Sequence, residues 1–246
     1  MISVTKLSKS YGTFDAISGI SFTVPEKSIC GLLGKNGAGK STTIKILTGS
    51  IPPTSGDAIL GGHSVVTNPD QVRRLIGYVP ENAPLYEDMQ LVEYLSFCAR
   101  LHGLKTNQVK SAVKESLERC SLDKVSTKLC AYLSRGQRQR AAIAQAIVHR
   151  PTILVMDEPS TGLDPTQIVS MRALIRELSE TATILFSSHI IQEVEALCSH
   201  VVVLSDGKVS ASGTIGDFTE KGKKLEDSFL SVIPQVSHEN AYEATL

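Results

Sequence analysis

The feature that most constrains this chain is a glycine-rich octapeptide, GKNGAGKS at residues 34–41, which fits the pattern GxxxxGK(S/T). A short apolar run over residues 28–33 precedes it and predicts a buried strand, and residues 42–48 predict a helix that ends at Gly49. Between a strand and a helix, glycines let backbone N–H groups turn inward, and the helix N-terminus adds positive potential. The octapeptide therefore predicts a triphosphate-binding loop, and a plain glycine-rich turn is the alternative.

Two side chains of this loop have distinct expected roles. Lys40 supplies a point charge for the β- and γ-phosphates, and the hydroxyl of Ser41 suits Mg²⁺. The residues expected to bind the phosphates through the loop and the start of the helix are Gly34, Lys35, Asn36, Gly37, Ala38, Gly39, Lys40, Ser41 and Thr42.

A pair of carboxylates, Asp157 and Glu158, follows a second apolar run at residues 153–156. Ligand sites of parallel sheets lie at the carboxyl ends of the strands. Asp157 can hold Mg²⁺ through a water molecule, and Glu158 can orient or deprotonate an attacking water. An acidic pair at a helix N-terminus is the alternative, but the phosphate loop favours the catalytic interpretation.

The spacing of apolar residues changes twice along the chain. The first 25 residues predict short strands, whereas between about residues 82 and 150 apolar residues recur at helical spacing and predict an inserted helical lobe. From residue 152 strands and helices alternate, and Asp206-Gly207 predicts a hairpin turn. This alternation favours a mostly parallel sheet with helices on both faces.

Composition narrows the classes of protein to which this chain can belong. The 246 residues are 41% hydrophobic with 18 glycines, which is typical of a globular domain, and the net charge of zero disfavours nucleic acid as the main partner. No window approaches the ~18 apolar residues of a membrane span, and residues 1–6 lack the pattern of a secretory signal. Five cysteines without a CxxC pair predict reduced structural thiols of a cytoplasmic protein.

A third segment, Leu133-Ser134-Arg135-Gly136-Gln137, opens a long predicted helix. Ser134 and Gln137 fit the capping box S-x-x-Q. This structural role suffices for the segment taken alone. However, a helix start also leaves free N–H groups, which can bind a phosphate.

In their order along the chain, these motifs resemble those of the ATP-binding subunit of an ABC transporter, over about residues 1–220. The octapeptide resembles the Walker A loop, and residues 133–137 resemble the LSGGQ signature. Asp157-Glu158 resembles the Walker B motif with its catalytic glutamate, and residues 160–164, STGLD, resemble the D-loop.

Two further residues carry the resemblance through their place in this order. His189, after Ser188, resembles the switch histidine, and Tyr11 sits where the family stacks an aromatic ring on adenine. Without this order, His189 would be interpreted as a histidine at the start of a helix, and Tyr11 as an aromatic residue in a turn. Likewise, Asp164 before Pro165 is alone an ordinary helix N-cap.

The resemblance implies a P-loop NTPase core of α/β class with a mostly parallel sheet, an N-terminal antiparallel β subdomain and an inserted helical subdomain. The nucleotide-binding domain is expected over residues 1–233, with the helical subdomain at about 82–150 and a polar tail at 234–246.

The resemblance also implies the roles of the site residues, with ATP and Mg²⁺ as cofactors. Glu158 and His189 are expected to be catalytic, and Ser41, Asp157 and Glu81 to hold the metal ion. Tyr11 is expected to bind the nucleotide of its own chain. Ser134, Gly136 and Gln137 are expected to clamp, across a two-fold interface, the nucleotide held by a second ATP-binding subunit.

Two residues depart from the family pattern. Glu81 stands where the family usually has the glutamine of its Q-loop, and a carboxylate keeps the metal contact while losing the amide's ability to donate. An acid there resembles a branch of prokaryotic exporters related to gliding-associated, polysaccharide and drug exporters. Arg135 replaces the first signature glycine, and we expect it to face water rather than a phosphate.

The implied partners are separate transmembrane permease subunits and a second ATP-binding subunit, identical or paralogous. The expected location is the cytoplasmic face of the cell membrane, as a peripheral subunit, and export is the favoured direction. Two alternatives are a soluble ABC ATPase that acts in assembly or regulation, and a GTPase. The GTPase is disfavoured because no Asn-Lys-x-Asp motif follows the phosphate loop.

Overall fold

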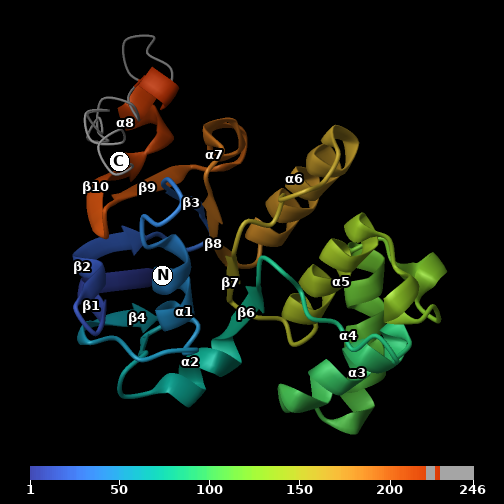
Figure 1. Ribbon diagram of the computed structural model, residues 1–246. Coiled ribbons are helices and arrows are strands. Elements are labelled where there is room, and N and C mark those ends of the chain that lie inside the picture. Colours follow the sequence, from blue (N-terminus) through green and yellow to red (C-terminus); the bar gives the residue numbers. More distant parts are fainter. Residues whose placement is uncertain (220–224, 228–246) are drawn as a thin grey trace, which may run out of the picture.

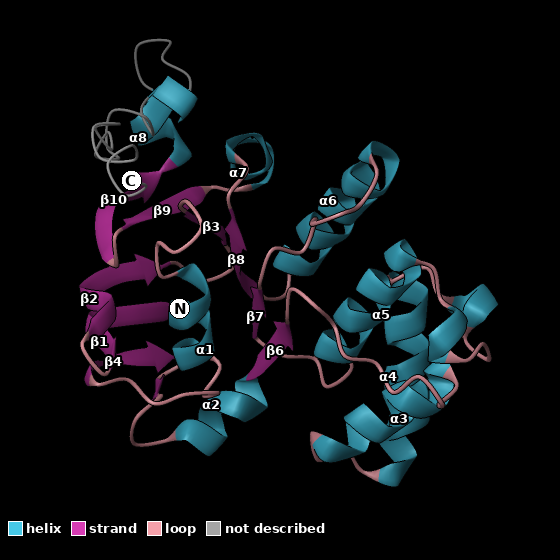
Figure 2. Cartoon of the chain, in the orientation of Figure 1, coloured by secondary structure: helices cyan, strands magenta, loops and turns pink. Residues whose placement is uncertain are grey.

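The computed structural model describes residues 1–219 and 225–227. Two β-sheets lie on one side of the molecule, and a lobe of helices lies on the other (Figures 1 and 2). The expected polar tail, residues 234–246, lies outside the described residues.

The larger sheet has six strands in the order β10-β9-β3-β8-β7-β6. Its strands are β3 (Ile29–Leu33), β6 (Ile76–Val79), β7 (Ile153–Met156), β8 (Thr183–Ser188), β9 (His200–Ser205) and β10 (Lys208–Thr214). All neighbouring pairs are parallel except β9 and β10, which are joined by the predicted hairpin turn at Asp206-Gly207. Every residue of β3, β7 and β8 is buried, as expected of parallel strands covered on both faces. The predicted mostly parallel sheet is confirmed.

The smaller sheet is the antiparallel subdomain that the resemblance implies. It has the order β2-β1-β4-β5. Its strands are β1 (Ile2–Tyr11), β2 (Phe14–Val24), β4 (Ser55–Leu60) and β5 (His63–Ser64). The residue pattern did not indicate β4, β5 or the helix α2 (Pro69–Leu75). Only Val72 of α2 is buried, so that helix has no apolar stripe to detect.

The remaining elements are helical. They are α1 (Lys40–Leu47), α3 (Leu91–Leu101), α4 (Thr106–Arg119), α5 (Arg135–Ile147), α6 (Pro165–Ser179), α7 (Ile191–Leu197), α8 (Ile215–Thr219), and the 3-10 turns η1 (Asp123–Val125) and η2 (Cys130–Tyr132). The helices α3, α4 and α5 form the lobe, within the region expected to be helical (Figure 1). No helix within the described ranges is both long and apolar enough to cross a lipid bilayer.

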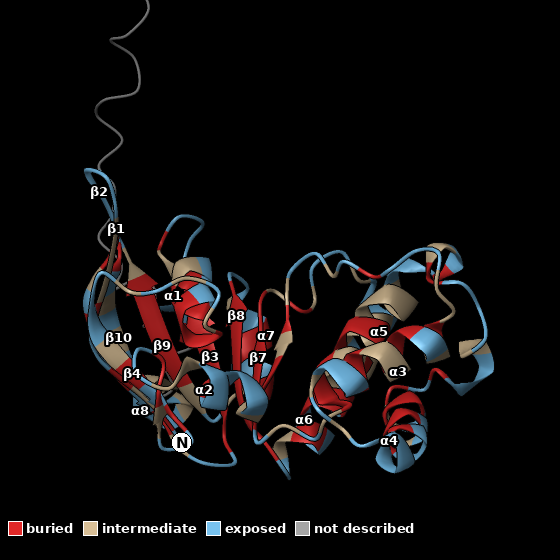
Figure 3. Ribbon diagram, turned by 90° about the horizontal axis from the view of Figure 1, so that it is seen from below, coloured by how far each residue is buried: buried red, intermediate tan, exposed pale blue. Residues whose placement is uncertain are grey.

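Two apolar clusters fill the molecule, one on each face of the larger sheet. Figure 3 shows that buried residues occur both in the strands and in the helices of the lobe. One joins α1 to the antiparallel sheet, through residues such as Ile44, Ile20 and Leu60. The other joins the lobe helices to α6 and α7, through residues such as Leu95, Ile143 and Ile175. All five cysteines are free thiols, as predicted.

The order of the larger sheet determines where the candidate site lies. The strands β3, β8 and β7 are neighbours and run parallel, so their carboxyl ends share one edge. The glycine-rich loop follows β3, Asp157 and Glu158 follow β7, and His189 follows β8. Residues more than 100 positions apart in the sequence therefore meet at this edge.

A pair of stacked histidines lies between the lobe and the sheet. The rings of His102 and His149 are parallel within 4°, with their centroids 3.7 Å apart. Nε2 of His149 lies 3.0 Å from the carbonyl oxygen of Ile76, and burial, with the neighbouring His102, lowers the pKa of His149 to about 4. His149 is therefore neutral in the folded protein at neutral pH.

This pair predicts a loss of stability in weak acid. The unfolded chain takes up the proton of His149 near pH 6.5, whereas the folded chain takes it up near pH 4, so unfolding becomes easier as the pH falls through that window. The loss is about 2–3 kcal/mol. The free energy of unfolding, measured with urea between pH 7 and pH 4, will change less with pH in His149→Gln than in the natural chain. Glutamine keeps a donor for the carbonyl oxygen of Ile76. His63→Gln, in β5, is the control and will keep the dependence of the natural chain.

Candidate active site

The glycine-rich loop has a backbone that only glycine tolerates. Gly37 and Gly39 have φ angles of 82° and 100°. A Cβ atom at Gly39 would lie 2.6 Å from Cγ2 of Ile17 and 2.8 Å from the carbonyl oxygen of Ala16. The helix α1 starts directly after Gly39, and no side chain of the described residues caps it. Its first N–H groups therefore remain available to an anion.

A cavity of about 330 Å³ opens above this loop, within the size range of small-molecule sites. Its wall combines residues from the loop, from the start of β2 and from the ends of β6, β7 and β8. The lining residues are Phe14, Ala16, Lys35, Asn36, Gly37, Gly39, Lys40, Ser41, Thr42, Glu81, Glu158, Thr161 and His189. Most of the residues expected from the loop line this cavity, together with Glu81, Glu158 and His189.

Lys40 is buried at the base of the cavity, with 6% of its surface exposed. Its Nζ atom donates hydrogen bonds to the carbonyl oxygens of Gly34 (2.7 Å) and Lys35 (3.3 Å), which fold the loop around the ammonium group. Nζ also lies 3.5 Å from Oε1 of Glu158. A cation held in this way can contact a phosphate that enters the cavity.

The carboxylate of Glu158 lies between Lys40 and His189. Its Oε2 atom is 2.9 Å from Nδ1 of His189, and its side chain is 11% exposed, so the acid faces the cavity from a largely dry position. Its φ angle of 48° is unusual for a residue with a side chain. Such strain is a feature of functional sites.

Asp157 is held by a hydrogen bond from a serine that no sequence pattern indicated. Ser187, on the neighbouring strand β8, donates a hydrogen bond of 2.6 Å from its hydroxyl to Oδ1 of Asp157. The same hydroxyl accepts a bond of 2.9 Å from the backbone N–H of Glu158. Asp157 is 5% exposed and does not line the cavity. The expected contact of Asp157 with a metal ion through a water molecule stays a prediction.

The oxygen donors of the cavity suit a hard cation. The hydroxyl of Ser41 and the carboxylate of Glu81 both lie on its wall, and Asp157 lies behind it. Oxygen ligands of this kind are the ones that Mg²⁺ prefers, with waters and phosphates completing its shell. Among residues 1–219 and 225–227, no group of three or more His, Cys, Asp or Glu side chains is positioned to hold a metal ion alone.

Phe14 is the aromatic residue on the cavity wall, and the expected nucleotide contact of Tyr11 stays a prediction. Tyr11 is absent from the cavity wall, and its ring lies under Nζ of Lys9, 5.3 Å away. Phe14, paired with Tyr11 across the β1–β2 turn and 64% exposed, lines the cavity instead. The two-residue turn at Gly12-Thr13 was the sequence signal that could have paired them.

The signature segment stands apart from the cavity of its own chain. The predicted capping box is confirmed, because Gln137 N–H donates to the hydroxyl of Ser134 (3.3 Å) and Ser134 N–H to Oε1 of Gln137 (3.0 Å). None of Ser134, Gly136 and Gln137 lines the cavity. Arg135 is exposed, but it does not face water alone as expected, since it donates to the carbonyl oxygen of Thr161.

The D-loop segment ends at the predicted helix N-cap, Asp164, which also forms a capping box with Gln167. Oδ1 of Asp164 accepts a 2.9 Å hydrogen bond from Gln167 N–H, and Pro165 occupies the first position of α6. The hydroxyl of Thr166 and this N–H hold the pKa of Asp164 below its usual value. Thr161, from the same segment, lies on the cavity wall.

Comparisons with known proteins agree with these features. A sequence model of the ABC transporter family matches residues 17–161. The chain is 37% identical to an uncharacterized ABC transporter ATP-binding protein, YxlF of Bacillus subtilis, over 96% of this chain and 82% of that protein. It is 38% identical to the bacitracin transport ATP-binding protein BcrA of Bacillus licheniformis, over 94% of this chain and 75% of that one.

Two further comparisons concern longer chains and solved structures. The chain is 36% identical to ABC transporter A family member 1 of Dictyostelium discoideum, of which it spans only 24%. Among solved structures, an ATP-binding subunit of an ABC transporter superimposes with a TM-score of 0.86 at 31% identity, over 94% of this chain and 99% of that chain.

The hydrogen bonds of Ser187 predict that this residue is important for stability. Ser187→Ala leaves a buried oxygen of Asp157 and the N–H of Glu158 without their partner, which costs about 1–3 kcal/mol in the free energy of unfolding. Ser205→Ala is a matched control, because Ser205 bonds the exposed Asp206 at 3.2 Å. Its loss will stay within about 0.5 kcal/mol in the same urea titration. Equal losses for the two variants would contradict this interpretation.

Proposed function

Because the chain belongs to the ABC transporter family of ATP-binding and ATP-hydrolysing proteins, we propose that it binds MgATP in the cavity above its glycine-rich loop and hydrolyses it to power export by a separate membrane partner. The observation that carries this proposal is the position of Glu158. Its carboxylate faces the cavity between the buried ammonium of Lys40 and the ring of His189.

Each residue of the cavity has a role in this mechanism. The backbone N–H groups of the loop and the ammonium of Lys40 bind the phosphates, and an incoming γ-phosphate replaces Glu158 as the partner of Lys40. Glu158 then accepts a proton from the attacking water, while its contact with His189 keeps the carboxylate aimed at the terminal phosphate. Phe14, on the open side of the cavity, is positioned to cover the base or ribose, alongside Tyr11.

Ser41, Glu81 and, through water, Asp157 are the residues that would hold Mg²⁺. The ion would supply positive charge that stabilises the negative charge of the phosphates. The proposed sandwich arrangement is supported by the signature segment, in which Ser134 and Arg135 are exposed and which does not line the cavity of its own chain. We assign Ser134, Gly136 and Gln137 to the nucleotide held by a second ATP-binding subunit. Hydrolysis then depends on closure of two subunits, because each supplies part of the stabilisation of the transferred phosphate.

Membrane coupling is assigned to a groove of about 660 Å³ between the lobe and the larger sheet. Tyr86, Tyr94 and Phe97 form an aromatic cluster on its wall, with ring centroids 5.7–5.9 Å apart, and Arg73 and His102 lie on the same wall. The groove suits a short amphipathic helix of a permease. We therefore place the chain at the cytoplasmic face of the membrane as a peripheral subunit.

Export is the proposed direction. BcrA, named as a bacitracin transport protein, matches most of this chain and supports a role in transport. In addition, Glu81 carries the acid that resembles an exporter branch. Affinity purification from detergent-solubilised native membranes tests the partner: we expect a polypeptide with several apolar segments of about 20 residues to co-purify. Recovery of the chain without any membrane protein would favour a role in assembly or regulation instead.

The mechanism predicts a trapped complex for one substitution. Glu158→Gln removes the base and keeps the shape of the side chain, so ATP hydrolysis falls by a factor of about 10²–10⁴ while ATP binding persists. Two chains then remain closed on their nucleotides, and sedimentation in MgATP will show a dimer. The control Glu180→Gln, at the exposed end of α6, will behave like the natural chain. A persistent monomer of Glu158→Gln at saturating MgATP would contradict the sandwich.

A further inference from the structure

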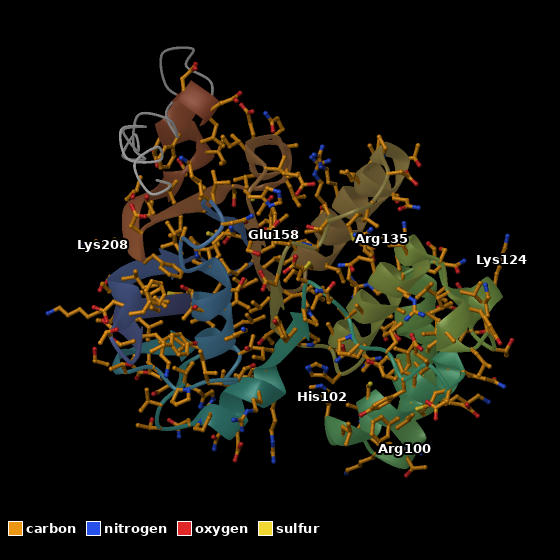
Figure 4. All side chains as sticks on the ribbon, in the orientation of Figure 1. Arg100, His102, Lys124, Arg135, Glu158 and Lys208 are labelled. Atoms are coloured by element: carbon orange, nitrogen blue, oxygen red, sulfur yellow. The ribbon has the colours of Figure 1, made fainter. Side chains whose placement is uncertain are left out.

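Arg135 makes contacts that have no role in the proposed mechanism. It is the first residue of α5, and its Nη2 atom donates a 3.2 Å hydrogen bond to the carbonyl oxygen of Thr161. Its guanidinium also lies where a side chain of residue 162 would begin, because a Cβ atom at Gly162 would overlap it. Gly162 has a φ angle of 71°, which strains any residue with a side chain, and a side chain there would displace the guanidinium. Figure 4 shows Arg135 between the lobe and Glu158.

This contact is part of a continuous junction between α5 and α6. One residue beyond Arg135, a Cβ atom at Gly136 would lie only 3.0 Å from the amide group of Gln167, so the two helix starts pack closely. One turn farther along, Nη2 of Arg140 donates a 2.8 Å bond to the hydroxyl of Ser170. The start of the signature helix therefore rests on the D-loop and α6 of the same chain.

Thr161 extends the contact to the catalytic acid. Its backbone N–H donates a 3.1 Å hydrogen bond to the carbonyl oxygen of Glu158, while its own carbonyl oxygen accepts the bond from Arg135. The two hydrogen bonds thus connect the guanidinium to the backbone of Glu158. That backbone has a positive φ angle, so it depends on its surroundings to hold its conformation.

We propose that Arg135 is a positioning residue for Glu158: by holding the carbonyl of Thr161 and covering Gly162, it fixes the segment 158–162 and aims the catalytic carboxylate. This inference rests on the proposed function, and it links the signature segment of a chain to that chain's own hydrolytic acid. A glycine at position 135, as in the usual signature, has no side chain to make this contact. The rigid fork of arginine also suits a carbonyl beside a bare glycine better than the single ammonium of lysine.

The first test measures the segment directly and needs no hydrolysis. Amide hydrogen exchange of the nucleotide-free chain, followed in peptides that contain residues 158–162, will be at least about fivefold faster in Arg135→Ala than in the natural chain. The matched control is Arg138→Ala, one turn along the same helix, whose guanidinium bonds Glu87 and the carbonyl of Ala131. It will leave the exchange of this segment unchanged. Equal exchange in Arg135→Ala and the natural chain would overturn the proposal.

The second test is kinetic. Arg135→Ala will lower kcat for ATP about tenfold and leave KM within about twofold, because it disorders the acid without touching the nucleotide. Arg135→Lys will recover part of kcat. The opposite pattern, a raised KM with kcat unchanged, would show that Arg135 contacts a phosphate of the partner's nucleotide and would overturn the proposal.

A double-mutant cycle with Gly162→Ala isolates the contact. In the natural chain, Gly162→Ala displaces the guanidinium and strains the backbone, whereas in Arg135→Ala only the strain remains. The two effects on kcat will therefore be less than additive, and strict additivity would overturn the proposal. If the natural chain does not hydrolyse MgATP, the proposed function is wrong, whereas the exchange measurement still decides whether Arg135 orders the segment.

Discussion

The site depends on the parallel pairing of β3, β8 and β7. Because these strands are neighbours and end at one edge, Lys40 and His189, from two distant parts of the chain, both contact the carboxylate of Glu158 from a third. The apolar clusters on both faces bury the strands, so the edge is rigid and its loops are the parts available for chemistry. The charges of Lys40 and Glu158 are compensated inside this edge before any nucleotide arrives, which makes a largely buried cation tolerable.

Much of this architecture could be predicted because its signals are local. The apolar runs before Gly34 and Asp157 gave two strands, and the spacing of apolar residues gave the lobe helices. Both capping boxes, at Ser134 and at Asp164, are patterns of four consecutive residues, and the structure contains both. The residue pattern predicted strands in the first 25 residues, but their antiparallel sheet was implied by the resemblance alone, and β4 begins with Ser-Gly-Asp, which does not favour a strand.

What could not be predicted depends on pairing between distant segments. Ser187 ends an apolar strand and shows no pattern of its own, and only the pairing of β7 with β8 brings it to Asp157. Phe14 replaces Tyr11 on the cavity wall because of the way a two-residue turn pairs the ends of β1 and β2. Arg135 was expected in water, since nothing in its neighbourhood along the chain indicates that Gly162 lies beneath it.

The contacts of strand β2 with the glycine-rich loop restrict how the antiparallel sheet can move. Ala16 and Ile17 of β2 leave no room for a side chain at Gly39, Ser18 N–H donates to the carbonyl of Gly207, and Gly207 N–H donates to that of Ala38. These contacts connect the antiparallel sheet to the glycine-rich loop and to the β9–β10 hairpin. The sheet therefore cannot move away from the loop without breaking them. We therefore expect the two sheets to move together as one block.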